Sequence, residues 1–183
     1  MRAAKVQVRL TVPFIGAISG DWEPDEAERR AAWEIYVELV TRVTAVELKR
    51  DEGLLREALS SLYSLFGTTR AILRGYGPRI APRRRAGKIS LGSIAIAMLN
   101  GAIRPVLSRW HPLLADYEAS RPSATPAMRH ESAWEHADAL RAELNTLRDL
   151  LIETARILGT VAGADDLLPF AVAEQPLPAP SRA

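Results

Sequence analysis

The sequence predicts a mainly α-helical protein, an antiparallel four-helix bundle with a kinked third helix and a short N-terminal β-strand or hairpin. Three observations support this prediction. Apolar residues recur every three or four positions over several long stretches, which is the period of an α-helix. One N-terminal stretch alternates apolar and polar residues instead, and short Gly- and Pro-containing segments separate the periodic stretches. We expect residues 1–163 to form one domain.

The first element is a strand predicted over residues 5–14, where apolar residues occupy every second position. A weak return strand could follow through Gly16. A strand in a helical chain needs a pairing partner, which is either this return strand, the same strand of a second copy or another protein. We therefore predict Val8, Leu10 and Val12 as interface residues.

Two helices are predicted next, over residues about 24–48 and 52–75. The first begins near Pro24, with acidic residues at the positive end of the helix dipole. Asp51 can cap the second, and Gly77 with Pro78 ends it. Trp33 is expected in the core or between helices.

The third and fourth helices are predicted over residues about 90–119 and 126–162. Pro105 and Pro112 each remove an amide donor from the third helix, so we expect a kink or two consecutive helices. The fourth helix carries a sustained heptad stripe that must face partner helices. Its members are Ala133, Ala137, Leu140, Leu144, Leu147, Leu151, Thr154, Leu158 and Val161. We predict Leu144 and Leu151 as association residues and Gly163 as the helix end.

The tail, residues 164–183, is Pro-rich and is expected to be loosely docked or disordered. The net charge of +2 does not demand a nucleic-acid or membrane partner. The absence of cysteine excludes disulfides, thiolate metal sites and cysteine catalysis, and fits a cytoplasmic protein. There is no apolar run of signal-peptide length, and the longest uncharged stretch is too short to span a membrane. We predict no metal site and no cofactor.

Four stretches, residues 22–43, 53–74, 94–114 and 134–144, together resemble a family of bacterial all-helical proteins that has no known function. The resemblance extends from about Val8 to Gly163. It implies that Trp33, Arg104, Trp110 and His111 belong to recurring motifs. It implies no activity.

Arg104 and His111 lie seven residues apart, which places them on one helical face. The Arg-x6-His spacing is similar to the motif of HEPN-type ribonucleases. This resemblance implies RNA cleavage, with His111 as general acid or base and Arg104 holding phosphate charge. Pro105 and Pro112 depart from the family's pattern. The structural alternative is that Arg104 pairs with a carboxylate and His111 caps a kink.

A basic segment covers residues 79–88, inside a longer stretch that lacks acidic residues between Glu57 and Asp116. Phosphate or nucleic acid is one possible ligand for it. The other possibility is that basic and acidic faces pair between helices or between copies. The candidate binding residues are Arg79, Arg83, Arg84, Arg85 and Lys88.

No convincing catalytic set is visible, while long heptad stripes and an unpaired strand favour association. The sequence therefore predicts a non-enzymatic helical interaction module, an adaptor or regulatory subunit that self-associates as a homodimer. The alternatives are a HEPN-like nuclease using Arg104 and His111, and a phosphate- or nucleic-acid-binding protein using the basic loop.

Overall fold

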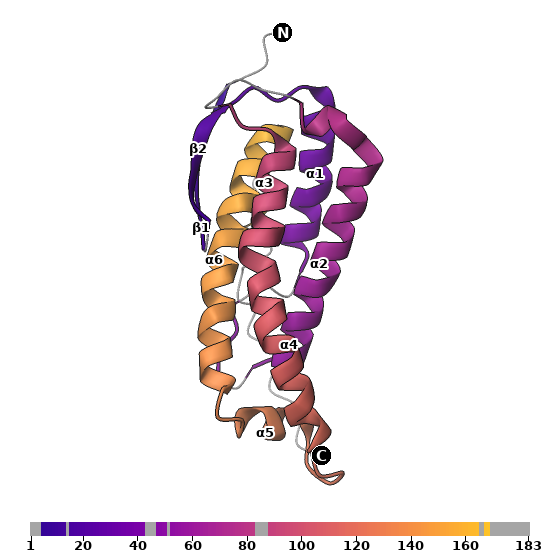
Figure 1. Cartoon of the computed structure of the whole chain (residues 1–183), viewed down its shortest axis with the longest axis vertical. Coiled ribbons are helices and arrows are strands. Elements are labelled where there is room, and N and C mark those ends of the chain that lie inside the picture. The colour runs from indigo at the N-terminus through magenta and orange to yellow at the C-terminus, as the bar shows by residue number, and fades with distance from the viewer. Residues whose placement is uncertain are drawn as a thin grey trace.

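The computed structural model describes residues 5–13, 15–42, 47–50, 52–82, 88–164 and 167–168. Over this part the chain is mainly helical and carries a short antiparallel β-hairpin, as the sequence predicts. The described part has five helices instead of the predicted four, counting as one the helix that continues through a π-helical turn. The helices α1 (Glu26–Val40), α2 (Leu55–Tyr76), α3 (Leu91–Met98) with α4 (Arg104–Ala119), and α6 (Ala137–Ala162) run along the long axis of the molecule (Figure 1). The short α5 (Ala127–Ser132) crosses one end.

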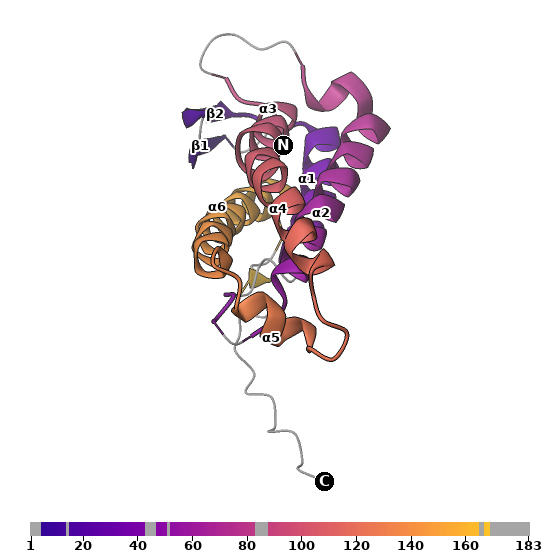
Figure 2. The ribbon, with the colours of Figure 1, turned by 60° about the horizontal axis from the view of Figure 1, so that its bottom comes forward.

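The hairpin consists of β1 (Val6–Val12) and β2 (Gly16–Trp22), paired antiparallel so that Leu10 faces Ile18. The strand and its return through Gly16 are therefore confirmed. The hairpin lies beside α3 and α6, on the side away from α2 (Figure 2). The apolar face of β1 packs into the core, and Val8, Leu10 and Val12 are at most 3% exposed.

The predicted interface residues are thus core residues of the same chain. The alternating pattern of β1 is explained by packing on the helices rather than by a partner molecule. Leu144 and Leu151 on α6 are also buried, at 6% and 3% exposure, because the heptad stripe of α6 faces α1 and β1. None of the five offers a surface to another protein.

Helix α1 begins with a capping box, in which Asp25 accepts from the amide of Glu28 and the Glu28 carboxylate accepts from the amide of Asp25. It ends at Val40 rather than near residue 48, so that prediction was too long. Side chains of α6 bind the backbone that follows, since Asn145 accepts from the amide of Leu48 and Arg141 donates to the carbonyl of Lys49. These tertiary bonds replace the helical ones.

Helix α2 begins after Leu54, which supplies no side-chain cap, and Asp51 lies outside the described residues. The cap comes from α5. The Glu131 carboxylate accepts from the amides of Leu55 at 2.7 Å and Arg56 at 3.2 Å. Burial raises the pKa of the Glu131 carboxyl above its usual value, while these two hydrogen bonds act in the opposite direction.

Helices α3 and α4 are joined by a π-helical turn, η3 (Leu99–Ile103), into a run that begins after the N-cap Ser90, at the helix start predicted near residue 90. Pro105 has no amide hydrogen for the carbonyl four residues earlier, and the wider turn lies directly before it. Taken as one helix, residues 91–119 are long and apolar enough to cross a membrane. The core helix of a soluble protein can have the same length and composition. In this helix, 61% of the 18-residue apolar segment is buried inside the structure.

The helix predicted over 126–162 is two helices, because residues 133–136 break it between α5 and α6. The break lets Trp134 pack on Trp110 and Tyr117, at ring distances of 6.0 and 5.6 Å. The α6 stripe from Ala137 onward is buried as predicted, and Gly163 ends the helix with a left-handed φ of 71°.

The beginning of the C-terminal tail contacts α1. The amide of Leu167 donates to the hydroxyl of Tyr36 at 2.7 Å, and Leu168 is 3% exposed. The rest of the predicted tail, from residue 169, lies outside the described residues. Trp33 was expected in the core or between helices, and it is not a core residue, since it is 43% exposed.

Candidate anion-binding pocket

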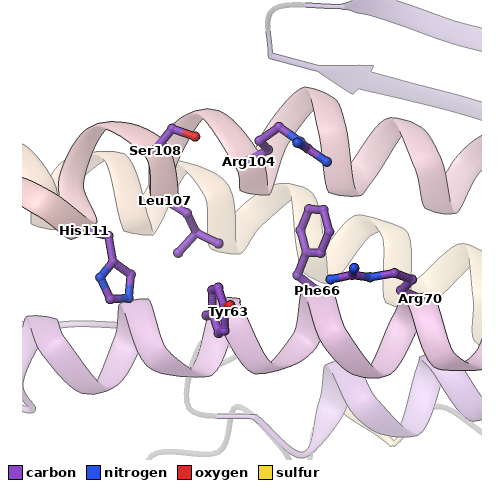
Figure 3. A pocket seen from close by; sticks show the side chains of 7 residues that line it. All are labelled: Tyr63, Phe66, Arg70, Arg104, Leu107, Ser108 and His111. Atoms are coloured by element: carbon purple, nitrogen blue, oxygen red, sulfur yellow. The ribbon is translucent and has the colours of Figure 1, made fainter.

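A pocket of about 680 Å³ lies between α2 and α4, which is within the size range of small-molecule sites. Figure 3 shows that the two helices contribute opposite walls. Among the described residues, no carboxylate lines the pocket. The lining residues are Tyr63, Phe66 and Arg70 from α2, and Arg104, Leu107, Ser108 and His111 from α4.

Two arginines on facing helices share one aromatic ring in this pocket. The guanidinium carbon of Arg70 lies 5.4 Å from the centroid of Phe66, and that of Arg104 lies 5.2 Å from it. Arg104 also donates from Nε to the side-chain oxygen of Asn100, in the π-helical turn, at 3.1 Å. Within the described residues neither arginine forms an ion pair with a carboxylate, so both positive charges face the pocket without a neutralising partner.

His111 is held at the other end of the pocket by a charged neighbour. Arg56 donates from Nη1 to Nδ1 of His111 at 3.0 Å, and its Nε contacts both carboxylate oxygens of Glu118 at 3.0 and 2.9 Å. A guanidinium donates hydrogen bonds and accepts none, so Nδ1 acts as the acceptor and the ring proton resides on Nε2. His111 is therefore positioned as a hydrogen-bond donor through Nε2.

Tyr63 forms the rim of the pocket on the α2 side. Its side chain is 68% exposed, and its ring meets that of His111 in a T-shaped arrangement with centroids 6.1 Å apart. Phe66 rises from α2 toward Arg104, while Leu107 and His111 extend from α4 toward Tyr63 (Figure 3). The pocket thus has a cationic end and an aromatic end.

The sequence singled out Arg104 and His111, and the structure brings them to one pocket. The structural alternative for Arg104, a carboxylate partner, does not occur among the described residues. Sequence reasoning missed Arg70 and Tyr63. The available signal was their spacing of seven on α2, which places them on the same helical face as Phe66.

The described residues of the basic loop, 79–82 and 88, do not line this pocket. Lys88 forms an ion pair with Glu23, and the hydrogen bond from Lys88 lowers the pKa of the Glu23 carboxyl. Arg79 lines a different pocket, of about 510 Å³, together with Tyr76 and Arg30. Arg83, Arg84 and Arg85 lie outside the described residues. The part of the loop that the structure describes is therefore not a shared phosphate site with Arg104.

Metal binding has no visible basis in the part of the chain that is described, where no group of three or more His, Asp or Glu side chains is arranged to hold an ion. His130 is instead used inside the fold. Its Nε2 contacts the carbonyl of Tyr117 at 3.0 Å, and its ring stacks on Tyr117 at 4.1 Å.

Comparison with known proteins adds no assignment, because no protein-family model, curated protein sequence or solved structure matches the chain. The resemblances inferred from the sequence stay predictions.

Proposed function

We propose that the protein is a non-enzymatic binding protein whose α2–α4 pocket holds an anionic group, with phosphate the best match, between Arg70 and Arg104. One observation carries the proposal. The two guanidinium groups come from facing helices, lie beside the same Phe66 ring and have no carboxylate partner among the described residues.

Phosphate fits this arrangement because guanidinium groups form bidentate, charge-assisted hydrogen bonds to its oxygens. An anion at about 4 Å from one guanidinium gains roughly 1 to 4 kcal/mol, depending on how far water is excluded. The apolar side chains of Phe66 and Leu107 reduce water access on the pocket walls. Bound anion also relieves the repulsion between the two arginines.

Isothermal titration calorimetry with inorganic phosphate and pyrophosphate tests the proposal. We expect Arg70→Gln and Arg104→Gln each to weaken binding about tenfold or more, which corresponds to the loss of a hydrogen bond to a charged group. Arg74→Gln is the matched control, since Arg74 is an exposed arginine on α2 that does not line the pocket. Equal losses for all three variants, or no binding by the unaltered protein, would contradict the proposal.

RNA cleavage is the second candidate, favoured by the placement of Arg104 and His111 on one wall of the pocket. The hydrogen bond from Arg56 argues against His111 as a general base. A base at Nε2 would need the ring proton on Nδ1, where it would oppose the Arg56 donor. Nε2 can still donate a hydrogen bond to a phosphate oxygen.

A nuclease assay on single-stranded RNA separates the candidates. We expect no cleavage by the unaltered protein above the level of a His111→Gln variant. Cleavage that disappears in His111→Gln but persists in Arg74→Gln would replace the binding proposal with the nuclease one.

We retain self-association as a proposal without a defined surface, because the residues first expected to mediate it are buried. We also propose that α1, α2, the α3–α4 run and α6 act as an antiparallel four-helix bundle, with Pro105 and Pro112 bending the third member. Light scattering on a size-exclusion column tests the first point, with a homodimer expected.

A further inference from the structure

We infer that the ligand of the α2–α4 pocket is a nucleoside monophosphate unit, either free or within a single strand. This inference rests on the proposed anion-binding function and adds the part of the ligand that is not phosphate. It comes from the difference between the two ends of the pocket.

The pocket is elongated, with charge at one end and an aromatic rim at the other. Tyr63 and Arg70 are two turns apart on α2, and His111 and Arg104 are two turns apart on α4, which is about 10 Å along each helix. A bare phosphate between Arg70 and Arg104 leaves the Tyr63 and His111 end unused. A ligand that fills the pocket carries its anionic group at one end only.

The aromatic end fits a flat heterocycle. Tyr63 presents its ring with 68% of the side chain exposed, and its contact with His111 is edge-on rather than stacked. Nucleobases stack on such exposed rings without regard to sequence, because every base has a π-face. An aliphatic acid bound in the pocket would leave the face of the Tyr63 ring exposed to water.

His111 adds a polar contact suited to a base. Because Arg56 donates to Nδ1, the Nε2 proton of His111 is available to a ligand acceptor. Nucleobases carry carbonyl oxygens and unprotonated ring nitrogens on their edges, which accept such a bond. Arg56 is in this sense a positioning residue for His111.

The surface between the two ends is open at Gly67, which helical spacing places between Tyr63 and Arg70 on the exposed face of α2. A Cβ atom at this position would meet no atom within 4 Å. The open surface leaves room for a sugar that connects a base on Tyr63 to a phosphate on the arginines.

Calorimetry with the full chain tests the inference, using AMP, UMP, ribose 5-phosphate, inorganic phosphate and a short single-stranded oligonucleotide. We expect the two nucleotides to bind about 5- to 150-fold more tightly than ribose 5-phosphate, the range for one stacked base. Tyr63→Ala should remove this difference, whereas Tyr63→Phe should keep it. Arg104→Gln should weaken all phosphate-bearing ligands together.

The outcomes are distinguishable. Equal affinity for phosphate, ribose 5-phosphate and nucleotides, unchanged in Tyr63→Ala, would overturn the nucleoside inference and leave the anion proposal intact. Absence of binding by every ligand would overturn both. Oligonucleotide binding tighter than AMP or UMP, with a steep salt dependence, would identify the single strand as the source of the nucleotide unit, and equal affinity would identify the free nucleotide.

Discussion

The charged side chain at the α2–α5 junction is buried and hydrogen-bonded within the fold, whereas the charged side chains of the α2–α4 pocket are exposed and lack carboxylate partners among the described residues. Glu131 is 4% exposed and its carboxylate accepts from two backbone amides that begin α2. Arg70 and Arg104 are exposed and lack carboxylate partners in the described part of the chain. A buried charge is tolerated where the fold satisfies it, whereas an unsatisfied charge beside a pocket remains available to a ligand.

Glycines show a similar contrast between the core and the exposed face of α2. At Gly101 a Cβ would lie 2.1 Å from Cδ1 of Ile15 and 2.9 Å from Cγ1 of Val12, because the hairpin packs directly on η3. At Gly67, on the exposed face of α2, an added Cβ would meet no atom within 4 Å. Close packing of the hairpin explains why residue 101 is a glycine. No neighbouring atom explains the glycine at position 67 in this way.

The largest effect is expected from removing the α2 cap. Glu131→Ala should destabilise the protein by about 3 kcal/mol, since two amides at a buried helix start lose their acceptor. Urea denaturation followed by circular dichroism measures this. Glu57→Ala, at an exposed glutamate in the first turn of α2, is the control and should cost about 0.5 kcal/mol through the helix dipole alone. Comparable losses in the two variants would mean that Glu131 does not cap α2.

The same carboxyl predicts a pH dependence with a defined sign. Because burial raises the pKa of Glu131 above its ordinary value of 4.5, its contribution to stability is fully present below pH 4.5 and declines as pH rises through the folded-state pKa. The Glu131→Gln variant has no carboxyl group at this position, so its stability does not carry this pH dependence. The stability deficit of Glu131→Gln relative to the unaltered protein should therefore shrink from pH 4 toward neutral pH in denaturation curves. A deficit that grows with pH would show that the hydrogen bonds outweigh burial.

The next effect concerns the hairpin. Gly101→Ala should cost about 1 to 3 kcal/mol, because the added methyl overlaps Ile15 and Val12 and the hairpin must shift. Thermal unfolding measures the loss. The double variant Gly101→Ala with Ile15→Ala removes the nearest overlap and should recover part of the stability. No recovery would place the cost in the π-helical turn itself.

Features set by short sequence spacing were predictable. The alternation in β1, the heptad stripe of α6, the Ser90 start and the Gly163 end all depend on residues a few positions apart, and each appears in the structure. Their buried faces were correctly identified. What covers those faces was not, so Val8, Leu10, Val12, Leu144 and Leu151 were assigned to an interface. In the structure β1 packs on α6, and α6 packs on α1 and β1.

Features set by distant residues were not predictable. The cap of α2 comes from Glu131, 76 positions away from Leu55, and the break before α6 is where Trp134 packs on Trp110. Arg104 and His111 were found because they share one helix, but Arg70 joins them only through the packing of α2 on α4. A single sequence shows well which face of a helix is apolar, but it shows poorly which other element packs on that face.

Replacing the open glycine should stabilise the protein. Gly67→Ala is expected to add about 1 kcal/mol, because alanine favours the helix and the added methyl has free space. Chemical denaturation measures the gain, and Gly75→Ala, also on α2 without close neighbours, provides a reference. A loss of stability in Gly67→Ala alone would mean that the α2 face is more crowded than the structure shows.

The smallest effect on folding is expected at the pocket arginines. Arg104→Gln should change the free energy of unfolding by no more than about 0.5 kcal/mol, since an exposed cation–π contact and one hydrogen bond to Asn100 contribute little in water. Denaturation of this variant and of Arg74→Gln, compared with the phosphate titration, separates folding from binding. A large loss of stability would show that Arg104 serves the α3–α4 run rather than a ligand. A small loss of stability, together with weaker phosphate binding, would show that the positive charge of Arg104 acts in ligand binding rather than in folding.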